Sequence, residues 1–452
     1  MKTKLIYPIL LSLILTILLS GCKKFLDEKP DKTLAVPHTL KDLQALLDQY
    51  PLINNSDPAA GEVSADDYYL TDADWAARKE TDQNMYLWQK HNLFDIATND
   101  WFRTFRPVYF SNTVLENIPG IPVTRFNRDE WNDIKGQALF YRAKAYLQAS
   151  FIWTQAYEES SATSDLGLPL RLNSDFNEVS VRSDLKGTYS QIIADLKEAA
   201  RTLALRPVHV IRPSKPAAYG LLARVYIAMR KYEQAGLYAD SCLKLKADLL
   251  DYNTLNPSAT YPVPQFNAEV IFESYFPPAP PISNSRAKIV PELYQMYAPN
   301  DLRKVVFFRA NTDGSRAFKG SYDPNGALFS GVASDEIYLI RAECFARAGK
   351  VTEAMNDLNT LLRKRWKAGT FTDFKAANTA EALNLILAER RKELLMRGLR
   401  WMDIKRLNRE GADIILSRTI KGKTYTLQPN DPRYALSIPE EIIELSKMVQ
   451  NP

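Results

Sequence analysis

Apolar side chains recur every three to four residues in three widely separated stretches of the chain, which is the spacing of one face of an α-helix. In each stretch a small alanine precedes an aromatic residue by three positions: Ala143 and Tyr146, Ala223 and Tyr226, Ala342 and Phe345. On a helix both members of such a pair share one face, where the alanine lets a neighbouring helix approach closely. The spacing therefore predicts packed helices in all three stretches.

The second and third stretches also fit the helix–turn–helix pattern of tetratricopeptide repeats, which are about 34 residues long. We expect helical pairs near residues 132–203, 214–247 and 334–365, the first of them interrupted by a long insertion. Because such repeats cannot bury their apolar faces alone, they stack into a superhelix. The pattern thus predicts a mainly α fold.

Other segments complete this picture. Further helices are expected at residues 40–50, 101–117 and 381–407, and short strands at 209–213 and 424–429. Segments rich in proline, glycine and asparagine, such as 257–267 and 276–285, are interpreted as ordered loops over the helical scaffold.

The N-terminus has the order of a bacterial secretion signal: lysines, an apolar run from Leu5 to Leu19, then two small residues before Cys22. The apolar run is shorter than the ~20 residues that span a bilayer. The sequence "LSGC" at 19–22 also resembles the lipobox of bacterial lipoproteins. We expect a cleaved signal peptide at 1–21, a lipid anchor with acyl chains such as palmitate on Cys22, and a tether over 22–38. The alternative is an ordinary signal peptide with an incidental cysteine.

Composition excludes several classes of protein. The net charge is only +5 and the charges are interleaved, so there is no electrostatic sign of nucleic-acid binding. The three histidines have no metal-ligand spacing, and no phosphate loop or nucleophile elbow occurs. Cys242 and Cys344 fall inside helical patterns and are interpreted as buried packing residues. Glu389 and Glu393 predict a charge network on a helix surface rather than a catalytic acid–base pair.

Four motifs resemble the SusD/RagB family of Bacteroidetes lipoproteins when taken together and in order. They are "CKKFLDEKP" (22–30), "LIRAECFARAGKVTEAMNDLN" (339–359), "ERRKELLMRGLRWMDIKRL" (389–407) and "IPEEIIELSKMVQNP" (438–452). The resemblance extends over the whole mature chain. It implies a single domain at 39–452, a tetratricopeptide-like right-handed α superhelix with a loop-rich inserted subdomain and few short strands.

The resemblance also implies a function. Members are nutrient-binding lipoproteins of the outer membrane, exposed at the cell surface, and they sit as a lid over a SusC-like TonB-dependent transporter. Their ligand is an oligosaccharide or sometimes a peptide or glycopeptide, and the expectation is a protein that is not an enzyme and needs no cofactor or metal. Arg400, Asp403 and Arg406 are expected to form ion pairs, and Trp401 to pack between helices.

Ligand contacts in the family lie in variable loops, so the candidate residues come from physical chemistry. Sugar recognition uses flat aromatic faces beside planar polar groups. The loop-rich segments 52–100 and 250–333 are expected to face the ligand and supply the candidate residues Asp66, Asp67, Tyr68, Tyr69, Trp75, Arg78, Tyr261 and Tyr322. The alternative is that these side chains pack the loops onto the superhelix.

Two other functions stay open. A membrane-tethered scaffold would hold a partner's peptide in the tetratricopeptide-like groove. A lipid-anchored glycan hydrolase is the more remote alternative, because the chain lacks a convincing acid–base pair.

Overall fold

The computed structural model describes residues 37–96, 98–277 and 279–452. The expected signal peptide, Cys22 and all but the last two residues of the 22–38 tether lie outside the described residues. Within the described part, none of the helices combines the length and the apolar character that crossing a membrane requires.

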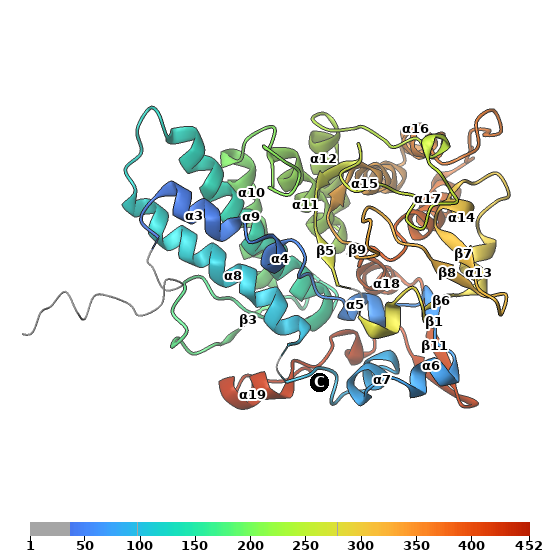
Figure 1. Ribbon diagram of the computed structural model, residues 1–452, viewed down its shortest axis with the longest axis horizontal. Coiled ribbons are helices and arrows are strands. Elements are labelled where there is room, and N and C mark those ends of the chain that lie inside the picture. The colour runs from blue at the N-terminus through green and yellow to red at the C-terminus, as the bar shows by residue number, and fades with distance from the viewer. Residues whose placement is uncertain (1–36, 97, 278) are drawn as a thin grey trace, which may run out of the picture.

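Helices that pack one on the next form the body of the molecule (Figure 1). They are α8 (Asp100–Asn117), α9 (Arg128–Trp153), α10 (Leu185–Thr202), α11 (Lys215–Ala228), α12 (Tyr232–Leu243), α15 (Ser334–Arg347), α16 (Val351–Leu362) and α17 (Thr379–Glu393). Figure 1 shows α8 and α9 at one end of this array and α16 and α17 at the other. The prediction of a mainly α fold is confirmed.

The alanine–aromatic pairs lie where these helices meet. Ala143, Ala223 and Ala342 have no exposed surface. The free thiols Cys242 and Cys344 are also buried, on α12 and α15, so their interpretation as packing residues is confirmed. A β-carbon added at Gly236 of α12 would lie 3.0 Å from the β-carbon of Cys344, which shows how closely the two helices approach.

Shorter helices surround the array. They are α3 (Leu40–Leu47), α4 (Tyr50–Ile53), α5 (Ala60–Ser64), α6 (Asp72–Ala76), α7 (Glu80–Tyr86), α13 (Pro291–Gln295), α14 (Arg303–Val306), α18 (Arg400–Asn408) and α19 (Glu440–Ser446). Thr39 starts α3 with a capping box, because its hydroxyl accepts the N–H of Asp42 while the Asp42 carboxylate accepts that of Thr39.

The strands of the described residues are short and pair two by two, all antiparallel. The pairs are β1 (Tyr68–Tyr69) with β6 (Lys288–Ile289), β2 (Leu166–Pro169) with β3 (Arg182–Asp184), β4 (Val270–Phe272) with β10 (Val332–Ala333), β5 (Tyr275–Phe276) with β9 (Leu328–Phe329), β7 (Phe308–Ala310) with β8 (Arg316–Phe318), and β11 (Leu416–Ile420) with β12 (Lys423–Leu427). Most of them lie in the loop-rich insertion between α12 and α15.

Three local predictions meet different outcomes. The strand expected at 424–429 is present as β12, whereas residues 209–213 form bends and turns, so that prediction is wrong. The single helix expected at 381–407 is also wrong, because the chain divides into α17 and α18. Between them Gly398 has φ +72°, a left-handed conformation that interrupts the helix and suits glycine.

Candidate functional site

Two candidate carboxylates of the N-terminal segment are tied to α17 and α18. Asp66 accepts two hydrogen bonds from Arg400, at 2.7 and 2.9 Å, and Asp67 accepts one from Nε of Arg391 at 2.8 Å. Burial raises the pKa of the Asp66 carboxyl, but the charge and hydrogen bonds of Arg400 together with the charge of Arg391 outweigh it, so the net pKa is well below its usual range. These pairs dock the segment on the helices, which leaves Asp67, buried, without access to a ligand.

Two candidate tyrosines lie in the core instead of on the surface. Tyr68 and Tyr322 are each 2 % exposed. The hydroxyl of Tyr68 donates to the carbonyl of Val63 at 2.7 Å, and that of Tyr322 donates to Oε2 of Glu269 at 2.7 Å. Because both rings are enclosed and both hydroxyls are satisfied internally, direct ligand contact by either residue is corrected to a structural role.

The other four candidates keep partial exposure, but they lie in two places. Tyr69 is in β1, Trp75 in α6, and Arg78 follows α6, with the Trp75 indole donating to the carbonyl of Gln83 at 3.4 Å. Tyr261 packs instead on the loop of the insertion that contains Gly326, where a β-carbon would lie 2.9 Å from the tyrosine hydroxyl.

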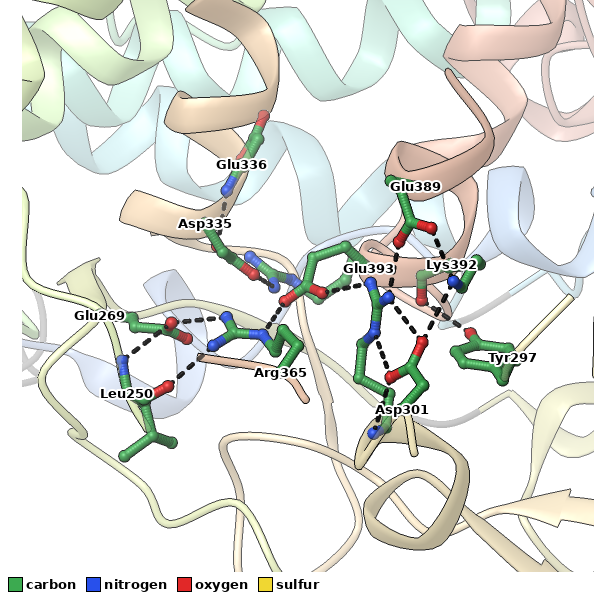
Figure 2. Close-up of polar contacts among 12 residues, drawn as sticks. Leu250, Glu269, Tyr297, Asp301, Asp335, Glu336, Arg365, Glu389, Lys392 and Glu393 are labelled. Carbon is green, nitrogen blue, oxygen red and sulfur yellow. Dashed lines mark hydrogen bonds and ion pairs between the residues drawn. The ribbon is translucent and has the colours of Figure 1, made fainter. Parts of the chain in front are cut away.

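The paired acids of α17 belong to a buried ion network (Figure 2). Arg303 contacts Glu389 through Nη2 at 2.6 Å and Glu393 through Nη1 at 2.9 Å. Arg365 lies between Glu393, at 2.7 Å, and Glu269, at 2.6 Å. The predicted network exists, but its predicted surface location is wrong. These charges can be buried because each carboxylate has a cationic partner that offsets its loss of hydration.

The ion pairs and the tryptophan of α18 agree with their predictions. Arg406 contacts Asp403 at 2.7 Å and Glu343 at 2.7 Å. Trp401 is 1 % exposed, and its indole N–H donates to the carbonyl of Tyr434 at 3.2 Å. These residues of the family-like motif stabilise the packing of helices and present nothing to a ligand.

A cleft of about 280 Å³ opens where the N-terminal loop-rich segment meets the insertion. Its apolar lining consists of Ala60, Val63, Met85, Leu93, Phe94, Pro277, Ala279 and Pro280, and its polar lining of Lys79, Thr81, Asp82, Asp95, Thr98, Asn99, Asp100 and Arg103. Residues of the two segments that the sequence assigns to ligand binding, 52–100 and 250–333, therefore form its walls.

The start of α8 holds the cleft in shape. Asn99 caps the helix, since its side-chain oxygen accepts the N–H of Phe102 at 3.0 Å and its amide donates to the carbonyl of Asp95 at 2.7 Å. The buried carboxylate of Asp100 accepts the N–H groups of Ala59 and Ala60 at 2.7 and 2.8 Å. The beginnings of α5 and α8 are thereby locked together beneath the cleft.

The polar groups of the cleft retain capacity for a ligand. Lys79 pairs with Asp95, which also accepts the Thr81 hydroxyl at 3.2 Å. Arg103 has its nearest described carboxylate, Asp100, at 3.6 Å, beyond hydrogen-bond distance. Burial raises the pKa of Asp82, whose carboxyl accepts no hydrogen bond from the described residues. Free donors and acceptors beside apolar side chains suit a hydroxyl-rich ligand.

The sequence directs attention to the correct neighbourhood of this cleft but not to its residues. The density of aromatic residues does not indicate Lys79, Asp82 or Arg103, because none of the three is aromatic. A helix-start signal was present in "TND" (98–100), where Asn99 precedes an amphipathic helix. That signal locates the start of α8, and only the fold reveals that this start faces the insertion.

Two family models match the chain. One, described as "Starch-binding associating with outer membrane", matches residues 24–227, and the other, described as the SusD family, matches residues 335–452. No curated protein matches the chain in sequence.

Solved structures share the fold at low sequence identity. A SusD superfamily protein from Bacteroides thetaiotaomicron superposes with a TM-score of 0.74 at 22 % identity, over 92 % of this chain and 100 % of its own. A SusD-like carbohydrate-binding protein from Bacteroides vulgatus has a TM-score of 0.67 at 19 % identity, with 91 % and 97 % covered. A laminarin-binding SusD-like protein has a TM-score of 0.63 at 17 % identity, again with 91 % and 97 % covered. Because the two family models match in chain order and together cover more than two thirds of the sequence, the chain belongs to the SusD/RagB family.

Proposed function

We propose that this protein is a nutrient-binding lipoprotein, anchored in the outer membrane through Cys22 and exposed at the cell surface. It captures an oligosaccharide and delivers it to a SusC-like TonB-dependent transporter. Family membership and the description of the matching model support carbohydrate binding at the outer membrane. The leader sequence and its lipobox-like "LSGC" support the anchor.

The observation that carries the proposal is the cleft between the two loop-rich segments. Its apolar floor includes Met85 and Phe94, and Asp82 and Arg103 stand beside that floor with hydrogen-bonding capacity. A pyranose ring has one apolar face and a rim of hydroxyls, so it needs both kinds of surface. Tyr69, Trp75, Arg78 and Tyr261 stay proposed contacts for ligand portions that extend beyond the cleft.

Binding proceeds without chemistry in this proposal. A glycosidase needs two carboxyl groups set across the sugar with room for water. The acids of the α17 network are each engaged by arginine or lysine in the core, which supports a structural role for them. The bound sugar therefore leaves unchanged when the lid passes it to the transporter.

The cleft is tested by removing its least engaged cation. Arg103→Ala is expected to weaken binding of laminarihexaose or maltohexaose about ten- to a hundredfold, the effect of losing a hydrogen bond from a charged donor. Isothermal titration calorimetry gives the dissociation constants. Arg106→Ala is the matched control, since Arg106 lies on the same helix over the ring of Phe102 and does not line the cleft. Equal affinities for both variants would contradict the assignment.

Delivery to a transporter needs a separate test. Gentle purification of the full-length lipoprotein from detergent-solubilised membranes is expected to bring down a barrel transporter in stoichiometric amount. A soluble partner alone, or a monomer after crosslinking, would favour the scaffold function instead.

A further inference from the structure

A second and larger concavity lies on the other side of the first turns of α8. It has a volume of about 470 Å³ and is lined by residues of α8, of the 169–180 loop that precedes β3, and of the segment around α19. We call it the α8 groove. Its volume falls within the range of about 300–1,000 Å³ that is usual for small-molecule sites.

The groove has aromatic walls that are fixed by the core. Trp101 and Phe105, one turn apart on α8, stack with ring centroids 4.5 Å apart. Behind them, the edges of Trp153 and Tyr146 contact the two rings at centroid distances of 4.9 and 6.1 Å. Phe176, on the 169–180 loop, also lines the groove; it is 78 % exposed, and its ring centroid lies 6.2 Å from that of Tyr109 on α8. Trp101 is only 6 % exposed and serves as the support for Phe105, which is partly exposed, so the core holds the Phe105 ring in place before any ligand arrives.

The loop that carries Phe176 is tied to α8 by buried polar contacts. Asn112, with no exposed surface, donates to the carbonyls of Arg171 and Asn173 at 2.9 and 2.8 Å, while its own oxygen accepts Nη1 of Arg142 at 3.0 Å. The N–H of Ser174 donates to the carboxylate of α8's Glu116 at 2.8 Å. Such pre-organisation lowers the entropic cost of ordering a loop upon binding.

Arg171 closes the same loop upon itself. Its Nη1 donates to the carbonyl of Glu178 at 2.9 Å and to the hydroxyl of Ser180 at 3.2 Å. Asn177 and Glu178 of this loop line the groove. The Asn177 amide donates to Asp175 at 3.1 Å, and one oxygen of Glu178 accepts the Asn173 amide at 2.6 Å. The Asn177 oxygen and the second Glu178 oxygen have no partner among the described residues and can accept hydrogen bonds from hydroxyls.

We propose that the α8 groove is a second binding site for a neutral oligosaccharide. The inference rests on the proposed carbohydrate-binding function and adds a site to it. Arg171 and Glu178 are the only charged side chains that line the groove among the described residues, and their charges offset each other, so an ionic ligand gains nothing here. Val179, Ile442, Leu445 and Met448 complete the apolar lining. The rings of Phe105 and Phe176 beside the amide of Asn177 favour a sugar over a partner's apolar side chains.

The two sites share the first turns of one helix. Asn99 and Arg103 face the cleft, whereas Trp101 and Phe105 face the groove. A sugar chain held at one site raises the effective concentration of its remaining units at the other. We therefore expect long oligosaccharides to bind more tightly than short ones by more than the number of their units explains.

Phe176 is the residue to test, because its exposure separates binding from folding. Phe176→Ala is expected to weaken binding of laminarihexaose or maltohexaose about five- to tenfold, and Phe176→Tyr to restore it. Phe126→Ala is the matched control, since Phe126 is 84 % exposed on another loop and does not line the groove. Calorimetry on the intact protein measures each dissociation constant, and the unfolding midpoint is expected to stay unchanged.

The outcomes separate this inference from the proposed function. Unchanged affinity in Phe176→Ala together with weaker binding in Arg103→Ala would overturn the groove and leave the cleft. The opposite pattern would support the groove and remove the cleft. A wild-type protein that binds neither glucan would overturn both for these sugars. If Phe176→Ala binds the glucan with unchanged affinity but no longer co-purifies with a transporter, the groove is a protein-docking surface, which also contradicts the inference.

Discussion

The carboxylate of Glu62 accepts a hydrogen bond from the main-chain N–H of Gly398, with 2.8 Å between Oε2 and N, across 336 positions of sequence. Gly398 lies in the left-handed turn that separates α17 from α18. The contact joins α5, beside the cleft, to the point where two helices of the C-terminal motif part. The conformation of this turn therefore helps to position the N-terminal segment against the C-terminal helices.

Replacing Gly398 by alanine tests how much this turn contributes. The φ of +72° disfavours any residue with a β-carbon, and that carbon would lie 3.3 Å from Cε1 of Phe276. We expect the free energy of unfolding in urea to fall by about 2 kcal/mol. Gly411→Ala is the control, because its φ is +81° with no atom within 4 Å, and it should lose only about 1 kcal/mol. Equal losses would show that contact with Phe276 is unimportant.

Glu62 itself predicts a dependence of stability on pH. Burial, with the charge of Asp67 as a second cause, raises the pKa of Glu62 to about 8, whereas its ordinary value is 4.5. Between these values the folded state keeps a proton that the unfolded state has released. The free energy of unfolding therefore falls as pH rises across that window, by at most about 1.4 kcal/mol per pH unit from this group.

Glu62→Gln isolates that contribution, because glutamine imitates the protonated side chain and does not titrate. Urea unfolding of both proteins at several pH values across the window gives the difference in stability. We expect wild type to lose stability relative to the variant as pH rises. Parallel curves would show that Glu62 titrates normally.

Arg365 tests the buried ion network. Its guanidinium has no exposed surface and lies between Glu269 and Glu393. Arg365→Met therefore leaves the buried Glu269 without its cation and Glu393 with Arg303 alone. We expect a loss of about 3–5 kcal/mol in the free energy of unfolding. Arg363→Met is the control two positions away, since that side chain is 52 % exposed and pairs with the exposed Asp373. A loss below about 1 kcal/mol is expected there. Similar losses at both sites would show that breaking the buried pair costs no more than breaking the exposed one.

The helical array was predictable from the sequence because its signal is local. Ala223 and Tyr226 are three residues apart, and that spacing predicts a packed helix, although α11 is buried on all its sides and not on one face alone. The exposure of the loop residues was not predictable, because it depends on distant partners. Asp67 is buried by Arg391, which is 324 positions away, and nothing near Asp67 in the sequence indicates it.

The residues of the candidate site could be predicted only in part, for the same reason. The sequence predicts ligand binding in two loop-rich segments, and a cleft does lie between them, because Asp82 and Met85 of the first meet Pro277 and Pro280 of the second. Aromatic density, however, selected Tyr68, which the fold uses for packing. An aromatic ring in a loop gives the same signal in a sequence whether the ring faces a ligand or the core.

The two described cysteines predict slow thiol chemistry. Cys242 and Cys344 are free and buried, and burial raises the pKa of both thiols well above the usual range. Because the thiolate is the reactive form, neither should be alkylated by maleimide in the folded protein, and both should be in urea. Mass spectrometry of protein prepared without the residues up to Cys22 measures this. Rapid labelling of either thiol without denaturant would show that α12 or α15 opens readily.

A substitution at Tyr322 tests whether this residue contacts the ligand or only stabilises the core. Its hydroxyl donates to Oε2 of Glu269 at 2.7 Å and lies 3.2 Å from Asp335, which Arg397 also contacts, so Tyr322→Phe leaves the buried Oε2 of Glu269 without a donor. We expect a loss of about 1–3 kcal/mol in the free energy of unfolding and an unchanged dissociation constant for laminarihexaose or maltohexaose. Urea unfolding and calorimetry on the same preparation measure both. Weaker glucan binding with full stability would restore Tyr322 as a ligand contact, because only an exposed hydroxyl affects affinity without affecting the core.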